Sequence, residues 1–93
     1  MRIIGIDPGT ICCGYGIVEI GGREPLYITS GDIRMSSKKP LPDRLKMLND
    51  SLKGIIAEYK PSQLCMEKIF YHKSIRSAFA LGLTRGIVML LAA

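Results

Sequence analysis

The stretch that decides the fold is Ile3-Ile4-Gly5-Ile6-Asp7-Pro8-Gly9-Thr10. Its β-branched residues are typical of a buried strand, and Pro8-Gly9 ends that strand directly after an acidic residue. We therefore expect a strand over residues 2–6 with Asp7 at its carboxyl end. In open α/β sheets ligands gather at this edge, so a carboxylate there indicates a chemical role. The alternative is that Asp7 only accepts hydrogen bonds from the amides of Gly9 and Thr10.

A second short strand also ends in an acidic residue. Residues 63–66 form an apolar run after a predicted helix, so we expect a strand parallel to the first, with Glu67 directly after it. If the two strands are neighbours, Asp7 and Glu67 lie side by side at one edge of the sheet. Two carboxylates this close share a proton or hold a divalent cation between them.

Two further strands are expected in the part of the sequence between Asp7 and Glu67. Residues 14–20 and 26–34 have strand character, and Gly21-Gly22 between them is a strong turn signal. Three strands joined by short turns form an antiparallel meander, which residues 63–66 join in parallel. The sequence therefore predicts an α/β fold with a mixed sheet.

Two helices are expected beside this sheet. Apolar residues at spacings of three and four predict a helix over residues 44–59, which Asp43 would cap and Pro61 would end. The helical pattern returns at Ser74. Its apolar face would consist of Ile75, Ala78, Phe79, Gly82, Leu83, Gly86, Ile87, Leu90 and Leu91.

Small residues recur every four positions in the second helix, at Ala78, Gly82 and Gly86. Glycine inside a helix costs about 1 kcal/mol relative to alanine, so it usually marks the close approach of another backbone. That neighbour is either the sheet beneath or the same helix of a second subunit.

The composition fits one α/β domain over residues 1–93, with 47% hydrophobic and 6% aromatic residues. The longest apolar run near the end is much shorter than the ~20 residues that cross a bilayer. No signal peptide precedes the first strand, so we expect a cytoplasmic protein without a membrane segment. Cys12, Cys13 and Cys65 lack zinc-site spacing and are interpreted as reduced core thiols.

Basic residues concentrate in the second part of the chain. Residues 1–33 hold two basic and four acidic side chains, for a net charge of −2, whereas residues 34–93 hold 11 basic and four acidic ones, for +7. Such a distribution favours a polyanionic partner.

The segment after Glu67 interleaves bases with aromatic residues, including Lys68, Phe70, Lys73 and Arg76. This mixture suits a nucleic-acid backbone with stacked or unpaired bases. The alternative is that Phe70 packs beneath its own loop.

Together these residues resemble the RuvC family of Holliday-junction resolvases. The resemblance covers all 93 residues in order, and it is carried by Gly5-Ile6-Asp7-Pro8-Gly9-Thr10, Gly14-Tyr15-Gly16, Glu67 with Phe70, and Leu81-Gly82 with Arg85-Gly86. It implies a ribonuclease H-like fold. It also implies a homodimer that binds four-way DNA junctions and cuts two strands of like polarity, with RuvA and RuvB as branch-migration partners.

The resemblance also implies residue roles. Asp7 and Glu67 match the family's first two catalytic acids, which hold two Mg²⁺ ions that activate a water and stabilise the leaving 3′ oxygen. Phe70 matches an aromatic residue that stacks near the crossover, and Lys68, Lys73 and Arg76 would bind DNA beside it. The helix of Ala78, Gly82 and Gly86 corresponds to the family's dimer helix.

The chain departs from the family pattern in two ways. Leu83-Thr84 stands where the family has Gln-Ala, and Ser74 stands where it has Asn. Family members also continue beyond the position of Ala93, through another strand and helices, to two more metal ligands. We therefore expect a truncated chain with half of the metal ligands and little cleavage activity of its own.

Three other functions remain open at this point. The chain could be a non-catalytic module that binds junctions or dimerises, or a related nuclease without junction specificity. Asp7, Gly9 and Thr10 also resemble the phosphate loop of the actin and Hsp70 ATPases, which would make the chain a nucleotide-binding module.

Overall fold

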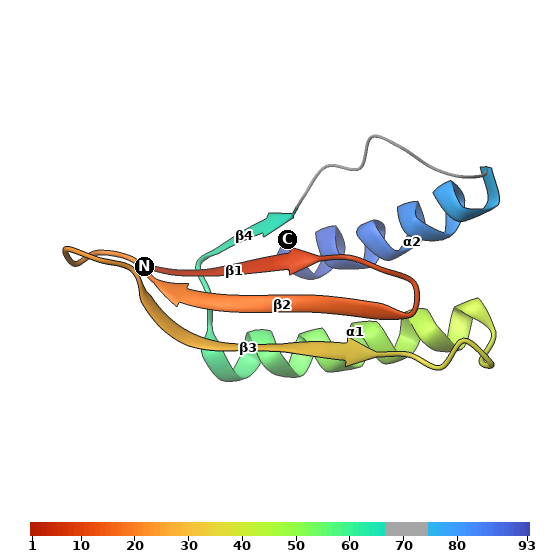
Figure 1. Ribbon diagram of the computed structural model, residues 1–93, viewed down its shortest axis with the longest axis horizontal. Helices are drawn as coiled ribbons and strands as arrows, with labels where there is room; N and C mark the ends of the chain where they lie inside the picture. The colour runs from red at the N-terminus through yellow and green to blue at the C-terminus, as the bar shows by residue number, and fades with distance from the viewer. Residues whose placement is uncertain (67–74) are drawn as a thin grey trace.

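The computed structural model describes residues 1–66 and 75–93, with side chains in the second segment from residue 81 onward. The strands form one mixed sheet in the order β3-β2-β1-β4 (Figure 1). Its elements are β1 (Arg2–Asp7), β2 (Cys12–Glu19), β3 (Leu26–Arg34), α1 (Leu41–Tyr59), β4 (Gln63–Met66) and α2 (Ile75–Ala92). β1 and β3 run antiparallel to β2, and β4 runs parallel to β1. The predicted mixed sheet is confirmed.

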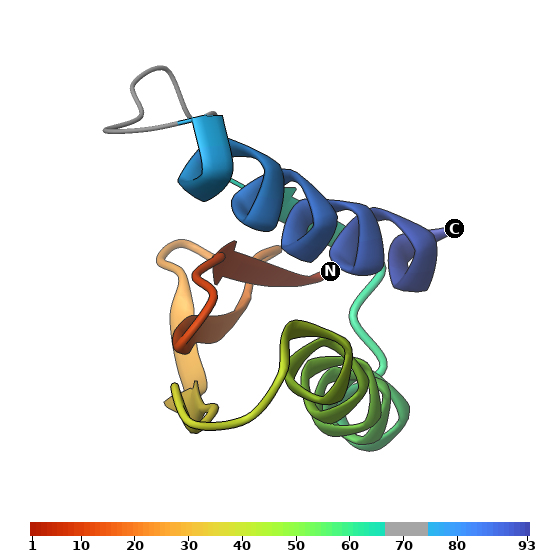
Figure 2. The ribbon, with the colours of Figure 1, turned by 90° about the vertical axis from the view of Figure 1, so that its right-hand side faces the viewer.

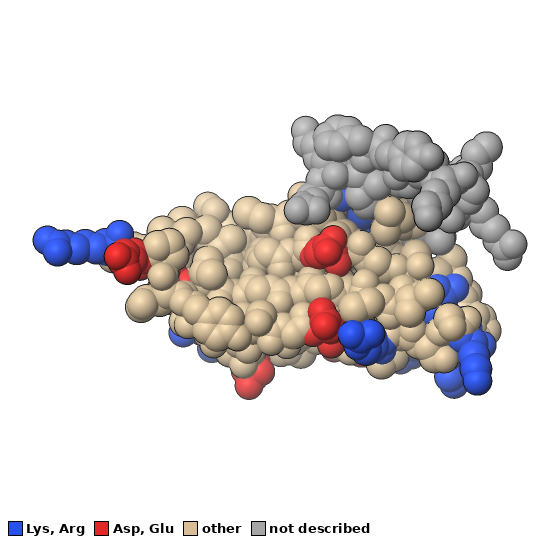
Figure 3. Space-filling model, in the orientation of Figure 1, with Lys and Arg blue, Asp and Glu red and all other residues tan. Residues whose placement is uncertain are grey.

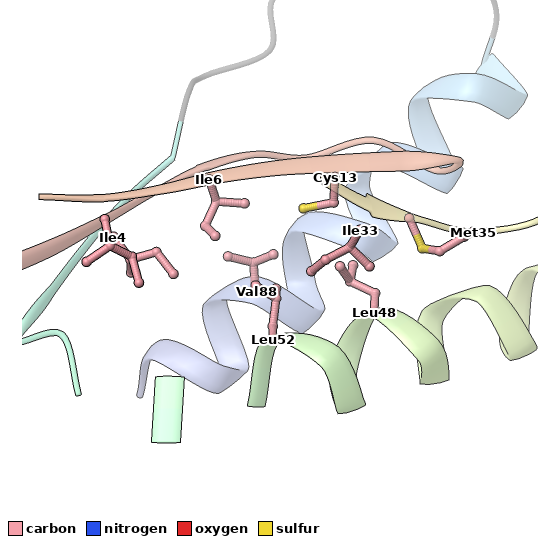
Figure 4. Close-up of a cluster of buried hydrophobic side chains, with 9 residues drawn as sticks. Ile4, Ile6, Cys13, Ile33, Met35, Leu48, Leu52 and Val88 are labelled. Carbon is pink, nitrogen blue, oxygen red and sulfur yellow. The ribbon is translucent and has the colours of Figure 1, made fainter. Parts of the chain in front are cut away.

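Both helices lie on one side of the sheet, where they also contact each other (Figure 2). The core fills the space between the helices and the sheet (Figure 4). Its buried members are Ile4, Ile6, Cys13, Ile17, Ile33, Met35, Leu48, Leu52 and Val88. Burying a side chain of the size of Leu or Ile contributes about 1.5–3 kcal/mol, so this single layer contributes strongly to the stability of the fold. The described helices leave the opposite face of the sheet uncovered.

Hydrogen bonds at the end of α1 hold β4 against β1. The guanidinium of Arg2 donates to the carbonyl oxygen of Tyr59 at 2.9 Å, and the carbonyl oxygen of Arg2 accepts from the amide of Ser62 at 2.9 Å. Between them Lys60 adopts the left-handed conformation at φ 50°, and its amide bonds the carbonyl oxygen of Ile56. The chain therefore leaves α1 at a position where β4 runs beside β1.

α1 begins earlier than the sequence predicted, at Leu41 instead of Arg44. Its N-cap residue is Pro40, and no side chain bonds the free amides there, so the predicted Asp43 cap is wrong. Pro42 does not prevent the earlier start, because proline lacks only an amide that the first helical turn leaves unbonded anyway.

The turn between β1 and β2 is tighter than predicted. β1 includes Asp7, and β2 begins at Cys12 rather than Gly14. A side chain at Gly9 would overlap the carbonyl oxygen of Cys12, so the turn accepts only glycine at this position. The close approach lets the pairing of β1 with β2 continue to Asp7 and Gly14.

α2 buries a face that overlaps the predicted one only in part. Ile87 and Leu91 pack against the core as predicted. Val88 is fully buried and Thr84 is 1% exposed, whereas Leu83 and Leu90 are 52% and 69% exposed. The prediction was wrong for Leu83 and Leu90 because apolar residues surround most of this helix, so their spacing does not decide which side meets the sheet. Over the part of the chain that is described, neither helix combines the length and apolar character that crossing a membrane requires.

Candidate metal and DNA-binding site

Asp7 ends β1 on the face of the sheet opposite the core. Ile4 and Ile6 point into the core, so the alternation of a strand places Gly5 and Asp7 on the other face. Asp7 is exposed, and no described residue donates a hydrogen bond to its carboxylate. The alternative interpretation, in which the carboxylate accepts bonds from the amides of the following turn, is therefore wrong.

A groove beside Asp7 has glycines as its floor. Gly5 pairs with Gly16 across β1 and β2, and Asp7 pairs with Gly14. Because these glycines carry no side chains, the groove has a volume of about 460 Å³. Its lining consists of Gly5, Ile6, Asp7, Gly14, Tyr15, Gly16, Cys65 and Met66. A ligand can approach the sheet backbone closely there, directly beside the carboxylate.

Hydrogen bonds fix the turn that follows Asp7. The amide of Met35, directly after β3, donates to the carbonyl oxygen of Ile11 at 2.6 Å. The Arg44 guanidinium donates to the carbonyl oxygen of Thr10 at 2.9 Å and to that of Lys39 at 3.1 Å. The end of β1 is thus connected to α1 and to the loop before it.

β4 brings the second predicted acid toward this edge. β4 runs parallel to β1, and its last described pair joins Met66 to Ile6. The predicted parallel neighbours are confirmed. Glu67 itself follows Met66 and lies outside the described residues, so the carboxylate pair of Asp7 and Glu67 stays a prediction.

A third carboxylate, which sequence reasoning missed, lies on the same face. Asp32 on β3 pairs with Gly14, so it stands two strands from Asp7 with only a glycine between them. A Cβ built on Gly14 would lie 3.6 Å from Oδ1 of Asp32 and 3.8 Å from Cβ of Asp7. The other Asp32 oxygen is 3.8 Å from Nη2 of Arg34. The signal in the sequence was the register of the meander, which places Asp7, Gly14 and Asp32 in one row.

The predicted DNA-binding residues are described to different extents in the structure. Lys68, Phe70 and Lys73 lie outside the described residues. Arg76 lies in the first turns of α2, where the backbone alone is described. The role of these four residues in DNA binding therefore stays a prediction.

The predicted dimer stripe can be followed at two of its three positions. Ala78 is described only as backbone in α2. Gly82 and Gly86 are exposed, and a Cβ added to either would meet open space. The alternative in which these glycines let α2 approach the sheet is therefore wrong. Contact with a second subunit stays a prediction.

The three cysteines are free but are not all core residues. Cys13 is buried, and burial, followed by the nearby charge of Asp7, raises its pKa from 9.0 to about 11. A thiol with this pKa is protonated at neutral pH and is a poor nucleophile or metal ligand. Cys65 is exposed, so its predicted place in the core is wrong: it occupies the groove face of β4.

The described part of the site fits a divalent cation that prefers oxygen ligands. Asp7 offers a solvent-exposed carboxylate, and Gly14 leaves the space beside it open. Within residues 1–66 and 75–93 there is no group of three or more His, Cys, Asp or Glu side chains that could hold a metal. The described residues therefore supply one ligand of such a site, at the position that the sequence predicted.

The comparison with family models identifies the family to which this chain belongs. A family model described as "Crossover junction endodeoxyribonuclease RuvC" matches residues 3–93. The chain belongs to the RuvC family.

Two curated RuvC relatives are similar over nearly the whole chain. Crossover junction endodeoxyribonuclease RuvC of Shewanella amazonensis is 47% identical over 90 residues, which cover 97% of this chain and 51% of the relative. The protein of the same name from Syntrophotalea carbinolica is 46% identical over 90 residues, or 97% and 56% of the two chains. The chain thus spans about half the length of these relatives.

A solved RuvC structure confirms the fold. The structure described as "T. thermophilus RuvC in complex with Holliday junction substrate" matches with a TM-score of 0.91 at 22% identity, over 99% of this chain and 56% of that one. The predicted ribonuclease H-like fold is therefore confirmed.

Proposed function

We propose that this chain acts in a Mg²⁺-dependent endonuclease of the bacterial cytoplasm that resolves four-way DNA junctions during recombination and repair. Membership of the RuvC family supports the junction as substrate. The observation that carries the proposal is Asp7 itself. It is an exposed carboxylate at the end of β1, beside a glycine-floored groove and next to a parallel strand that leads directly to Glu67.

In this proposal Asp7 and Glu67 bind Mg²⁺ through their carboxylate oxygens. When bound there, the ion would supply a water nucleophile at neutral pH and would stabilise the leaving 3′ oxygen of the cut strand. The glycine floor of Gly5, Gly14 and Gly16 lets a phosphate approach Asp7 without steric hindrance. The buried side chains of Ile4 and Ile6 hold β1 in place, so the Asp7 carboxylate is positioned before the substrate binds.

DNA binding is assigned to the segment after β4 and the start of α2. Phe70 would stack on a base near the crossover, and Lys68, Lys73 and Arg76 would contact phosphates. Base stacking and phosphate contacts do not read base edges, so these residues would recognise the shape of an open junction.

A homodimer accounts for cuts in two strands of the same junction. Gly82 and Gly86 are exposed on α2 with open space beside them, and Ala78 continues their spacing. We assign this stripe to the contact with the second subunit. RuvA and RuvB are the branch-migration partners that the family resemblance implies.

The test is cleavage of a synthetic four-way junction by the natural gene product that carries these residues. We expect paired nicks in two strands of like polarity, formed only with Mg²⁺ and sealed by DNA ligase. Excess linear duplex should compete weakly. Equal cleavage of linear duplex would favour a nuclease without junction specificity, and tight junction binding without any cleavage would favour the non-catalytic module.

A further inference from the structure

The loop that joins β3 to α1 lies at the same end of the molecule as Asp7 (Figure 1). β1 and β3 both run antiparallel to β2, so their carboxyl ends lie at the same end of the sheet. We call residues 36–40 the basic loop, because Lys38 and Lys39 stand at its centre. Figure 3 shows Lys and Arg side chains gathered at this end of the molecule.

Lys38 and Lys39 differ from the other bases in this region in their partners. Arg34 lies 3.8 Å from Asp32, and Lys46 lies 3.0 Å from Asp50. Both loop lysines are exposed, and none of the described carboxylates forms an ion pair with either. Their charges are therefore available to an external anion.

Hydrogen bonds hold the basic loop in one conformation. The amide of Lys38 donates to Oγ of Ser36 at 3.2 Å, and the amide of Lys39 donates to the carbonyl oxygen of Ser36 at 3.1 Å. Arg44 then joins this loop to the turn after Asp7, because its guanidinium bonds the carbonyl oxygens of both Lys39 and Thr10. The two lysines thus stand on a scaffold that is directly bonded to the turn of the candidate metal site.

An extended polyanion fits this surface better than a small anion does. The hollow beside the basic loop has a volume of about 410 Å³, and its lining includes the acidic Asp43 and Asp50 as well as the basic Lys39, Arg44 and Lys46. The two carboxylates weaken the attraction of these bases for a small anion inside the hollow, since Asp50 already pairs with Lys46. A phosphate backbone that passes over the exposed lysines avoids these carboxylates and gains one contact per phosphate.

We propose that Lys38 and Lys39 bind the phosphate backbone of the substrate DNA on the β3 side of Asp7. The inference rests on the proposed nuclease function and extends its DNA contacts beyond the segment that follows β4. Substrate would then cross the carboxyl edge of the sheet from β4 to β3, with Asp7 between its two points of attachment.

The experiment compares the Lys38→Gln/Lys39→Gln double variant with the natural gene product in junction binding from 50 to 300 mM KCl. Each lost phosphate contact lowers the slope of log affinity against log salt concentration by about 0.9, so the slope should fall by nearly 2. At the lowest salt concentration we expect at least about tenfold weaker binding. The Lys38→Arg/Lys39→Arg variant, which keeps both charges, should bind as the unmodified protein does.

The matched control is Arg23→Gln/Lys53→Gln, which removes the same net charge at two exposed positions outside the basic loop. Its salt slope should change by less than half a unit, and thermal midpoints will verify that both variants fold. If the loop variant and the control bind alike, the inference is wrong while the nuclease proposal stands, and an acidic protein surface becomes the better partner for this loop. If the unmodified protein neither binds nor cuts junctions, both proposals fail.

Discussion

Asp7 on β1 and Asp32 on β3 stand in one row across the sheet, separated only by Gly14 on β2. A single methyl group at Gly14 would lie within 4 Å of both acidic residues. The space beside the Asp7 carboxylate therefore exists because β2 has no side chain at this point. The groove that we assign to metal and phosphate binding depends on this glycine as much as on the carboxylate.

The role of Gly14 can be tested by filling the space above it. In Gly14→Leu the new side chain would occupy the groove. We expect junction cleavage to fall at least about tenfold, because the substrate phosphate could no longer reach its reactive position beside Asp7. Gly54→Leu is the matched control, because nothing lies within 4 Å of a Cβ on the exposed face of α1 there. It should leave cleavage unchanged and stabilise the chain by about 0.5–1 kcal/mol. Full cleavage by Gly14→Leu would exclude the groove as the substrate site.

The orientation of α2 predicts unequal effects of two neighbouring truncations. Val88→Ala removes two fully buried methyl groups and should lower the free energy of unfolding by about 1.5–3 kcal/mol. Leu90→Ala removes a side chain that is 69% exposed, so the loss should stay below about 0.5 kcal/mol. Urea denaturation measures both values, and a larger loss for Leu90→Ala would show that α2 faces the sheet differently.

The turn at Gly9 should be sensitive to the smallest substitution. A Cβ at this position overlaps the carbonyl oxygen of Cys12, which is backbone and cannot move without disturbing the start of β2. We expect Gly9→Ala to destabilise the chain by roughly 2 kcal/mol or more. Gly22→Ala, where a Cβ meets nothing within 4 Å, serves as the control in the same thermal melts. Equal midpoints for the two variants would contradict this account of the turn.

The buried thiol of Cys13 predicts a loss of stability in alkali. Its pKa rises from 9.0 to about 11 in the folded chain, so above pH 9 the unfolded chain releases this proton while the folded chain retains it. Stability should therefore fall between about pH 9 and 11, by at most about 1.4 kcal/mol per pH unit. The difference in unfolding free energy between the unmodified chain and Cys13→Ala isolates this effect. A difference that does not change with pH would mean that the thiol is accessible to water.

The strands could be predicted from the sequence because their signals are local. Ile3 to Ile6 are β-branched apart from one glycine, and Pro8-Gly9 marks the end of the strand. The parallel order of β1 and β4 followed from the helix between them, since such a connection returns the chain to the same end of the sheet.

Two of the three features that the sequence did not predict depend on contacts between distant residues. The buried side of α2 is set by Val88 against the sheet and α1, and a helix with apolar residues on most sides gives no periodic signal for it. The early start of α1 at Leu41 was missed because Asp43 resembled a cap. Asp32 was missed because its place beside Gly14 follows from the register of three strands and not from any motif.

The most direct test of the central claim compares Asp7→Asn with Asp32→Asn in the natural gene product, using Mg²⁺-dependent junction cleavage and junction binding together. Both changes remove one negative charge from the same face of the sheet. We predict that Asp7→Asn lowers cleavage at least about 100-fold, the effect of about 3 kcal/mol of lost transition-state stabilisation, and leaves binding intact. Asp32→Asn should retain cleavage within about threefold, because Asp32 lies two strands from Asp7 and three from β4. Cleavage by Asp7→Asn at the unmodified rate would contradict the assignment of Asp7 as a metal-binding catalytic residue.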